Sequence, residues 1–285
     1  MKPLSSLFRS LGRACALVLL VMVGSTLLVR MAPGYLSDAR EMDARYGDIA
    51  RAELAQEGAQ SRSLTQMLAR EMRGWLRGDE GVSRQFGVPV GELIRPRLAV
   101  TGALLLRSLL LGWLLALSAA LLAATRRQSG MVWQAPATLL LAIPAAVMAT
   151  LCLLVGGGGP VLVMAMAIAA RDFKFLYRML RQAWLQPYLL QARAQGIRMR
   201  RLLAVHIAPV IATQLAALAG LSMVTALSAL VPVEVLFDVP GLGQLAWNAA
   251  MNRDLPVLLA ATLLMALAVT GSGMLSGQTS EWERA

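Results

Sequence analysis

Side chains that could carry chemistry are few in this sequence, and they do not form a catalytic set. The chain has one histidine, His206, and two cysteines, Cys15 and Cys152, which stand in apolar runs. It contains no phosphate-binding loop of the G-x-x-x-x-G-K type. One histidine cannot build a metal site, so we interpret His206 as a polar residue at a helix end, with a proton relay as the alternative. We therefore expect no catalytic residue, no metal and no cofactor on this chain.

The segment from Pro187 to His206 is polar and basic, and it stands between two stretches apolar enough to cross a bilayer. Pro187 is suited to start a short helix, and Gly196 is suited to end it, because glycine tolerates a positive φ. A second helix that contains Arg200 and Arg201 is expected to follow. A helix–glycine–helix lying along the membrane surface could insert into a cleft of a soluble partner. An inert basic loop is the competing interpretation.

The composition places this chain in a membrane. Hydrophobic residues make up 57% of its 285 residues and the mean hydropathy is +0.61, which is too apolar for an ordinary soluble domain. A helix needs roughly 20 residues to cross the hydrocarbon core. A Gly-rich break at 156–160 divides the longest charge-free run into two spans, so six are predicted in all. They are expected at about 14–31, 98–124, 132–154, 161–180, 207–232 and 256–276.

Lysine and arginine predict the orientation, because connections rich in positive charge stay in the cytoplasm. With the N-terminus inside, the cytoplasmic connections carry the whole net charge of +11 and the remaining charges sum to zero. Both termini are therefore expected in the cytoplasm. Topology explains the basic balance, so nucleic acid is not expected as a partner. Arg107 is a charge inside the second span, and it is expected to snorkel to lipid head groups or to line a pore.

The chain is expected to have three parts. Residues 1–31 form a cytoplasmic tail and the first span, and residues 97–285 form a five-helix core with a cytoplasmic coupling loop at 181–206. Between them, residues 32–96 carry nine basic and ten acidic side chains and many good helix formers. We interpret 32–96 as an external helical segment, which either covers the mouth of the core, rests on the membrane surface or is a solvated spacer.

Four short patterns resemble one family of membrane proteins. The core of the coupling loop, Ala192-Arg193-Ala194-Gln195-Gly196, resembles the "EAA loop" of binding-protein-dependent ABC importer permeases. The dipeptide/oligopeptide/nickel branch of that family has an external turn similar to Glu234-Val-Leu-Phe237-Asp-Val-Pro240-Gly241-Leu242-Gly243, followed by Arg253-Asp254-Leu-Pro256. Two further patterns resemble the same branch: Trp75-Leu-Arg-Gly78-Asp79-Glu-Gly81-Val-Ser83 with Val88-Pro89-Val90-Gly-Glu-Leu-Ile94, and Met31-Ala-Pro33-Gly34.

The resemblance implies an all-α integral membrane protein, an ABC importer permease bundle of six transmembrane helices in the bacterial inner membrane. It implies alternating access for a peptide, nickel or a similar small solute. The implied partners are ATPase subunits that hold ATP and Mg²⁺, a second permease subunit in a heterodimer, an extracytoplasmic solute-binding protein and membrane lipid. Contact with the ATPase is implied for Tyr188, Ala192, Arg193, Ala194, Gly196, Arg200, Arg201 and His206. A place in the external turn is implied for Pro240, Gly241, Gly243, Arg253 and Asp254.

Some residues depart from the pattern of that family. Gln195 stands where the family usually has lysine, and Pro209 follows His206 sooner than the family's proline does. The connection between the third and fourth spans is cut to a Gly-rich turn. The usual substrate and the usual outer vestibule do not follow from the resemblance alone.

Two other classes of protein are weighed against the importer. An ion- or proton-coupled secondary transporter should carry carboxylates deep in its spans. No Asp or Glu is expected there, because the fourth predicted helix runs past Arg171 into the cytoplasm and Asp172 is counted with the basic residues on that side. A non-transporting scaffold or sensor would bind a ligand through its external 32–96 segment. Co-purification of an ATPase subunit would separate the importer from both.

Overall fold

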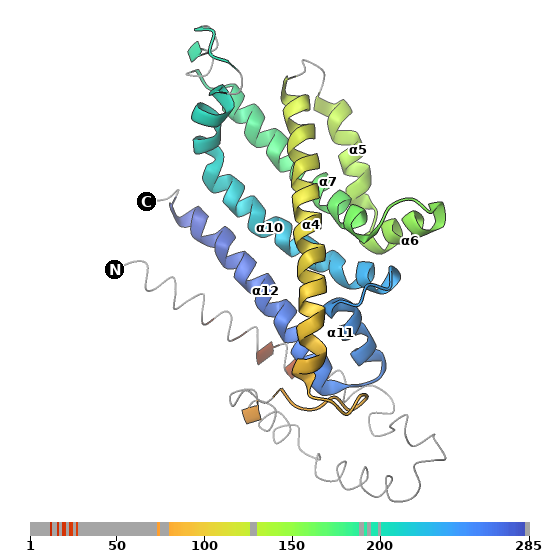
Figure 1. The fold of residues 1–285 in the computed structure, drawn as a ribbon. Helices are drawn as coiled ribbons and strands as arrows, with labels where there is room; N and C mark the ends of the chain where they lie inside the picture. The colour runs from red at the N-terminus through yellow and green to blue at the C-terminus, as the bar shows by residue number, and fades with distance from the viewer. Residues whose placement is uncertain are drawn as a thin grey trace, which may run out of the picture. The chain divides into compact units, whose positions relative to one another are not determined.

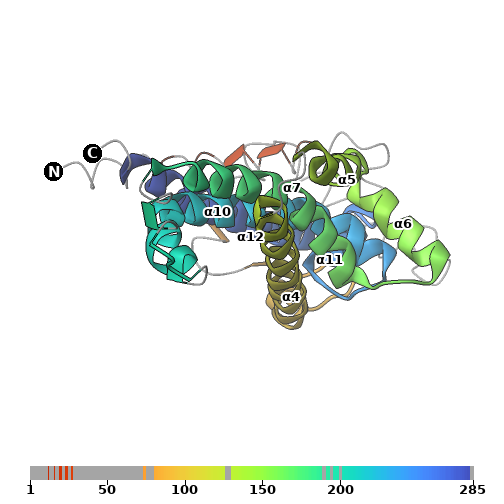
Figure 2. The ribbon, with the colours of Figure 1, turned by 90° about the horizontal axis from the view of Figure 1, so that it is seen from above.

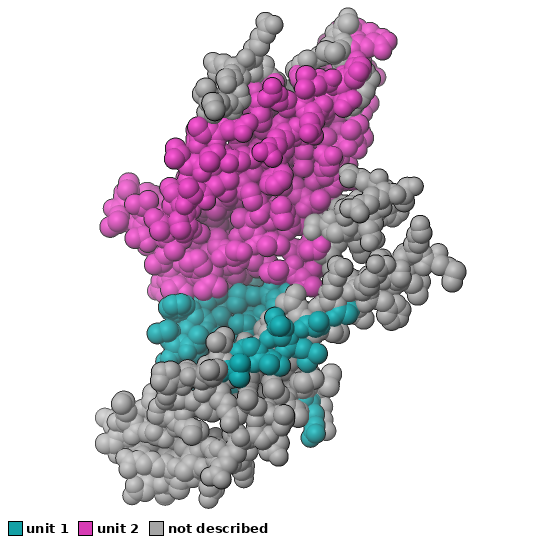
Figure 3. Space-filling view, turned by 180° about the vertical axis from the view of Figure 1, so that it is seen from behind, with its two compact units in different colours: residues 1–99, 240–267 teal, residues 100–239, 268–285 magenta. Residues whose placement is uncertain are grey.

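The computed structural model describes a few isolated positions between 12 and 74, and residues 80–125, 130–187, 191–192, 195–198 and 201–282. Every named element in this part of the chain is a helix, and an isolated antiparallel bridge joins Val82 to Pro89. Most of the predicted first span and most of the predicted external segment lie outside the described residues. The chain divides into two compact units, which Figure 3 colours separately. The larger unit takes in residues 100–239 and 268–285, and the smaller takes in residues 1–99 and 240–267.

The larger unit contains most of the helices (Figure 1). It begins inside α4 (Val90–Thr125), which crosses from one unit to the other at residue 100. It continues through α5 (Gly130–Ala142), α6 (Ala145–Val155), α7 (Pro160–Trp184), the π-helical stretch η2 (Leu202–Ile207) and α10 (Ala208–Leu236). α7 and α10 run side by side in Figures 1 and 2. Helices are therefore present where the second, fourth and fifth spans are predicted.

α4 approaches α7 closely at Gly112. A Cβ atom added to Gly112 would lie 3.0 Å from Ile168 Cβ and 3.1 Å from the carbonyl oxygen of Ala165. Ser108 and Ala116, one turn before and one turn after Gly112, are buried on the same face of α4. Small side chains let the backbones of two helices come together, as they do in membrane helix pairs. Gly112 therefore allows the close approach of α4 to α7.

The third predicted span, 132–154, is not one continuous helix, and this prediction is wrong. α5 ends at Ala142, and α6 begins at Ala145 with a bend of 97° between them, visible in Figure 1. Pro144 lies in the break with an extended backbone, at φ −57° and ψ 144°. Proline has no backbone N–H to donate, and it disfavours helical geometry in the residue before it. The helix therefore stops here and restarts in a new direction.

The predicted glycine break between α6 and α7 is confirmed. Gly156 follows α6 with φ +65°, and the N–H of Gly157 donates to the carbonyl of Cys152 at 3.2 Å. This six-to-one hydrogen bond across a left-handed residue is the Schellman ending of a helix. Pro160 then takes the first position of α7, where a missing N–H leaves no helical hydrogen bond unmade.

The helix predicted after Gly196 and the predicted fifth span form one continuous helical run, whereas the sequence had separated them. The N–H of Ala208 donates to the Leu203 carbonyl five residues earlier, which is the π-helical pattern of η2. Pro209 follows in the first turn of α10. A proline at this place removes a donor and crowds the carbonyl of Val205, four residues before it. The wider π turn relieves this conflict without ending the helix.

One apolar cluster holds the larger unit together. It joins α4, α5, α7, η2 and α10, and three of its buried members, Ala183, Ala192 and Leu202, fall within the predicted coupling loop. α7 supplies the centre of the cluster, where Leu176 is 0% exposed. The buried members are Ala116, Ala120, Ala123, Ala137, Phe173, Leu176, Tyr177, Leu180, Ala183, Ala192, Leu202, Ile207, Ile211 and Leu218.

The smaller unit is built from α11 (Leu242–Met251), the first part of α12 (Leu255–Trp282) and the first turns of α4. Its apolar cluster draws on all three helices. The buried members are Val90, Ile94, Leu242, Leu245, Ala249, Val257 and Ala260. α12 covers the sixth predicted span.

Within the described residues, three helical stretches are long and apolar enough to cross a membrane. They are Val90–Ala124, Ala208–Leu236 and Leu255–Gly273, and the bent α5–α6 pair makes a fourth if it is counted as one span. Several leucines of α4 are exposed, among them Leu110 and Leu114 at 64% and 66%. Large apolar side chains on the outside suit a lipid environment rather than water. The described fold is that of a multi-pass helical membrane protein.

Candidate functional site

The predicted coupling loop, residues 181–206, contains the glycine-ended helix that the sequence predicts. Gly196 has φ +74°. The N–H of Ile197 donates to the carbonyl of Ala192 at 3.3 Å, and the N–H of Gln195 donates to that of Gln191 at 3.0 Å. These bonds make a Schellman ending with Gly196 as its left-handed residue. The prediction that Gly196 ends this helix with a positive φ is confirmed.

The coupling loop packs on the apolar cluster of the larger unit through Ala192. Ala192 is 6% exposed and belongs to the cluster, and Ile197 is partly buried against it. An apolar contact between the residues that flank the glycine commonly accompanies this helix ending. Gly196 and Arg201 are exposed. The loop is therefore attached to the helices by one side and presents its glycine and Arg201 on the other.

The remaining predicted residues of the coupling loop are only partly described. Tyr188, Arg193, Ala194 and Arg200 lie outside the described residues. The backbone of His206 lies in η2. Contact of this loop with an ATPase stays a prediction.

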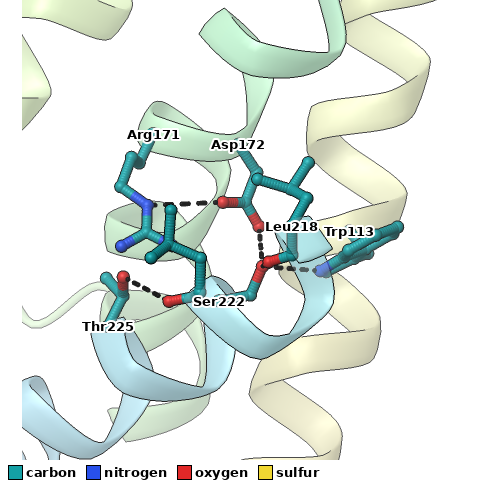
Figure 4. A network of polar contacts seen from close by, with 7 residues as sticks. Trp113, Arg171, Asp172, Leu218, Ser222 and Thr225 are labelled. Carbon is teal, nitrogen blue, oxygen red and sulfur yellow. Dashed lines mark hydrogen bonds and ion pairs between the residues drawn. The ribbon is translucent and has the colours of Figure 1, made fainter. Parts of the chain in front are cut away.

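A network of polar side chains joins α4, α7 and α10 (Figure 4). Ser222 of α10 lies at its centre, between Asp172 of α7 and Trp113 of α4. The Ser222 hydroxyl donates to Asp172 Oδ2 at 2.5 Å, and Trp113 Nε1 donates to Ser222 Oγ at 3.1 Å. Asp172 and Ser222 are both 0% exposed. The network fixes one position on each of three helices.

The guanidinium of Arg171 balances the buried carboxylate of Asp172. Arg171 Nε lies 3.6 Å from Asp172 Oδ1, and the Arg171 side chain is 22% exposed. Within the described residues, Arg171 Nε, Arg171 Nη2 and Asp172 Oδ1 are buried atoms without a hydrogen-bond partner. A buried polar atom left unpaired costs about 1–3 kcal/mol. Ser222 thus links Asp172 to α10 and α4 through hydrogen bonds, whereas the contact of Asp172 with its counter-ion Arg171 is longer than a hydrogen bond.

Two carboxylates are buried among the helices, which the sequence analysis does not predict, whereas the absence of carboxylates deep in a membrane span stays a prediction. Asp172 lies in the middle of α7 and is fully buried, although the sequence placed it in a cytoplasmic connection. Glu234 near the end of α10 is also 0% exposed and accepts a hydrogen bond from Thr101 Oγ1 at 2.7 Å. The stretch from 171 to 201 contains eight basic residues and one acidic residue, Asp172, so its net charge gives no sign that Asp172 is buried. Its position on the apolar face of α7, four residues before Leu176, was the available signal.

The external turn brings two of the sequence patterns together in the smaller unit. The Asp254 carboxylate accepts hydrogen bonds from the Ser83 hydroxyl and from the backbone N–H groups of Arg84 and Gln85, the latter two at 3.2 Å. Asp254 and Ser83 are both 1% exposed. Ser83 Oγ also accepts from the N–H of Phe86 at 3.0 Å. Asp254 thereby holds the turn before α4 against the start of α12.

Two residues of the external turn region take left-handed backbone conformations without being glycine. Asp238 has φ +52° and Arg253 has φ +56°. Both follow the end of a helix, and the N–H of the next residue closes a six-to-one hydrogen bond, from Val239 to Glu234 and from Asp254 to Ala249. Gly241 and Gly243 are buried, whereas Pro240 is exposed. The predicted turn residues are thus brought together around the start and end of α11.

Arg107 lies on the exposed face of α4, next to the buried Ser108. Both predicted roles of Arg107, at lipid head groups or in a pore, remain predictions. In the part of the chain that the structure describes, no group of three or more His, Cys, Asp or Glu side chains could hold a metal ion.

Comparison with known families identifies the class of this protein. The family described as "Binding-protein-dependent transport system inner membrane component" matches residues 108–277, which is more than half of the chain. The matched range contains the polar network, the coupling loop and the external turn. The chain belongs to this family.

Individual relatives agree with the family assignment. A protein of Brucella suis biovar 1 named as a peptide permease is 26% identical over 305 residues, and the alignment covers 93% of this chain and 92% of the relative. The oligopeptide transport system permease protein AppB of Bacillus subtilis is 32% identical over 121 residues, covering 39% of this chain and 37% of its own length. The oligopeptide transport system permease protein OppB of Escherichia coli K12 is 31% identical over 78 residues, covering 27% and 26%. The first relative shows that the correspondence extends over nearly the whole chain.

The chain is therefore a multi-pass inner-membrane permease subunit of an ATP-driven, binding-protein-dependent importer. Its relatives are permease subunits rather than enzymes, and ATP is hydrolysed by a separate ATPase subunit. The family implies an ATPase, a solute-binding protein and a second permease subunit as partners.

Proposed function

We propose that this permease imports peptides by alternating access, with the coupling loop as the element that follows the ATPase. The permease would have six spans and both termini in the cytoplasm, and it would pair with a different permease subunit. ATP and Mg²⁺ would be held by the partner ATPase.

The attachment of the coupling loop to the helices carries this proposal. Ala192 and Ile197 of the loop pack on the same cluster as α7, η2 and α4. A packed interior is close to incompressible, so a displacement of the loop is passed on to these helices rather than absorbed. The exposed side of the loop, with Gly196 and Arg201, is left to contact the ATPase.

Peptide is favoured over nickel by the names of the relatives. The Brucella suis relative is named as a peptide permease, and the relatives from Bacillus subtilis and Escherichia coli are named as oligopeptide permeases. The charge distribution supports the topology, because the net charge of +11 falls on the predicted cytoplasmic side. A permease moved by ATPase closure needs only a difference in affinity between its two states, not a tight solute site.

Reconstitution of the complete importer tests the proposal. The permease, purified with its ATPase and second permease subunit, is placed in vesicles with the binding protein, and uptake of labelled peptide and of ⁶³Ni²⁺ is measured. ATP-dependent uptake of peptide without nickel is expected. Failure of an ATPase to co-purify from native membranes, or uptake that does not depend on ATP, would overturn the proposal.

Charge reversal in the coupling loop tests whether this loop contacts the ATPase. Arg200→Glu with Arg201→Glu should abolish ATPase stimulation by loaded binding protein while the subunit still inserts in the membrane. Arg95→Glu reverses an exposed charge in the smaller unit and serves as the control. Normal stimulation in the coupling-loop variant would remove the loop from the mechanism.

A further inference from the structure

The polar network of Figure 4 joins the helix that enters the coupling loop to the helix that leaves it. α7 ends at Trp184, and η2 begins at Leu202 and runs on into α10. Asp172 lies on the first of these helices and Ser222 on the other, fifty residues later. A movement of the loop therefore acts on both of the helices that carry Asp172 and Ser222.

The Ser222 hydroxyl has one proton and two acceptors within reach. It lies 2.5 Å from Asp172 Oδ2 and 2.8 Å from the carbonyl oxygen of Leu218, on its own helix. A serine hydroxyl donates one hydrogen bond at a time. If α10 moves away from α7, Ser222 can turn its proton to Leu218, as serines in helices commonly do. The tie between the helices can thus open without leaving Ser222 unpaired.

The other side of the network is incompletely paired in the described state. Arg171 Nε, Arg171 Nη2 and Asp172 Oδ1 are buried without hydrogen-bond partners. A buried network that serves only stability is expected to be fully satisfied, because each unpaired atom is costly. Arg171 and Asp172 form an ion pair at 3.6 Å, which is longer than a hydrogen bond, so both side chains keep hydrogen-bonding capacity for other partners. Incomplete pairing in one state is therefore consistent with a network that changes partners.

We propose that Asp172 and Ser222 are positioning residues of the transport cycle, which tie α7 to α10 in the resting state and separate when the ATPase pulls on the coupling loop. Trp113 holds the Ser222 hydroxyl in line for Asp172 from α4. On release, Ser222 bonds to the Leu218 carbonyl and Asp172 bonds to Arg171. This inference rests on the proposed function, because the tie is released by the coupled ATPase.

Removal of the Ser222 hydroxyl tests whether its hydrogen bond to Asp172 holds α7 to α10 in the resting state. In the reconstituted importer, Ser222→Ala should raise the basal ATPase rate threefold or more, because the resting state loses stabilisation relative to the released state. The stimulation by loaded binding protein should fall by at least half. Ser228→Ala is the matched control, since Ser228 also bonds to the carbonyl four residues earlier, that of Val224, but is exposed on α10. If Ser222→Ala and Ser228→Ala have the same basal ATPase rate and the same stimulated ATPase rate, the inference is overturned.

A covalent bridge provides the second test, which does not depend on how well Ser222→Ala folds. Asp172→Cys and Ser222→Cys are combined with Cys15→Ala and Cys152→Ala, and the pair is bridged by an oxidant or a short bifunctional thiol reagent. Bridging should reduce peptide uptake at least tenfold, and reduction should restore it. Uptake that continues unchanged in bridged protein would show that α7 and α10 do not separate here.

The two proposals fail in different ways. If the unmodified importer does not take up peptide with ATP, or no ATPase binds it, the proposed function is wrong. If the unmodified importer takes up peptide with ATP, but Ser222→Ala has the same ATPase rates as Ser228→Ala and the covalent bridge leaves peptide uptake unchanged, only the present inference is wrong.

Discussion

The Asp254 carboxylate accepts a hydrogen bond from the hydroxyl of Ser83, which stands 171 residues earlier in the chain. The backbone N–H groups of Arg84 and Gln85 donate to the same carboxylate. Asp254 directly precedes α12, where its negative charge also suits the helix N-terminus. One side chain thus stabilises both the turn before α4 and the start of the last helix.

Asp254→Ala should destabilise this contact strongly. The change leaves one hydroxyl and two N–H donors without their charged acceptor, and each lost bond to a charged group is worth about 1.5–3 kcal/mol. Hydrogen exchange of the amides of Arg84 and Gln85 should become at least tenfold faster, as measured by mass spectrometry of the detergent-solubilised protein.

Asn252→Ala provides the comparison for Asp254→Ala. The Asn252 side chain, which caps the end of α11, donates to the Asn248 carbonyl and is exposed. Its removal should leave exchange at Arg84 and Gln85 unchanged. If both variants accelerate exchange equally, Asp254 is not what holds the turn.

Gly196→Ala should weaken the end of the coupling-loop helix through its backbone alone. A Cβ at Gly196 would meet nothing within 4 Å, so the cost comes from the φ of +74° and amounts to about 1–2 kcal/mol. Gly196→Asn should cost less, because asparagine adopts the left-handed conformation more readily. Binding-protein-stimulated ATPase activity should rank glycine first, asparagine second and alanine third. An alanine variant as active as the parent would contradict this order.

Gly112→Ala should separate α4 from α7. The added methyl would lie within 3.0–3.1 Å of Ile168 and of the Ala165 backbone, so the helices must move apart by a few tenths of an ångström. Such overpacking typically costs about 1–3 kcal/mol. A lower thermal midpoint is expected when loss of the monodisperse peak is followed by size-exclusion chromatography.

Gly102→Ala makes the same chemical change elsewhere on α4, where the new Cβ meets nothing within 4 Å. Alanine is favoured over glycine in a helix by about 1 kcal/mol, so this variant should keep or raise the midpoint. Equal midpoints for the two alanine variants would show that the approach of α4 to α7 is not tight.

Thr101→Val should destabilise the larger unit by leaving the buried Glu234 carboxylate without the Thr101 hydroxyl. The substitution keeps the shape of the side chain, so the loss reports the hydrogen bond of 2.7 Å and should be about 1.5–3 kcal/mol. Thr101→Ser retains the hydroxyl and should recover most of the thermal midpoint. If serine is no better than valine, packing of the methyl group rather than the hydrogen bond stabilises this site.

Local signals were read correctly from the sequence. Gly196 and the break at 156–160 were predicted because glycine and proline determine backbone geometry at their own positions. The break at Pro144 was missed because membrane helices often contain proline, and sequence alone does not show whether a neighbouring helix satisfies the freed carbonyl.

The polar network could not be predicted for a different reason. Asp172 and Ser222 are fifty residues apart, and their contact depends on how α7 and α10 pack. Charge counting treated Asp172 as part of a basic connection, whereas burial on the apolar side of α7 gives it a partner. Similarly, Ser83 and Asp254 were noticed as parts of two separate patterns, and only the fold pairs them.

The π-helical stretch η2 determines where this chain tolerates a change in length. An α-helix advances by about 100° per residue, so deleting one residue within α10 before Ser222 would rotate the serine away from α7. η2 contains one extra residue compared with an α-helix, because its hydrogen bond spans five residues instead of four. Loss of the exposed Val205 would convert the stretch to a regular helix and leave Ser222 facing Asp172, but it would also restore the crowding caused by Pro209. Natural shortening of this region is accordingly expected at 202–207, together with replacement of Pro209, rather than further along the helix.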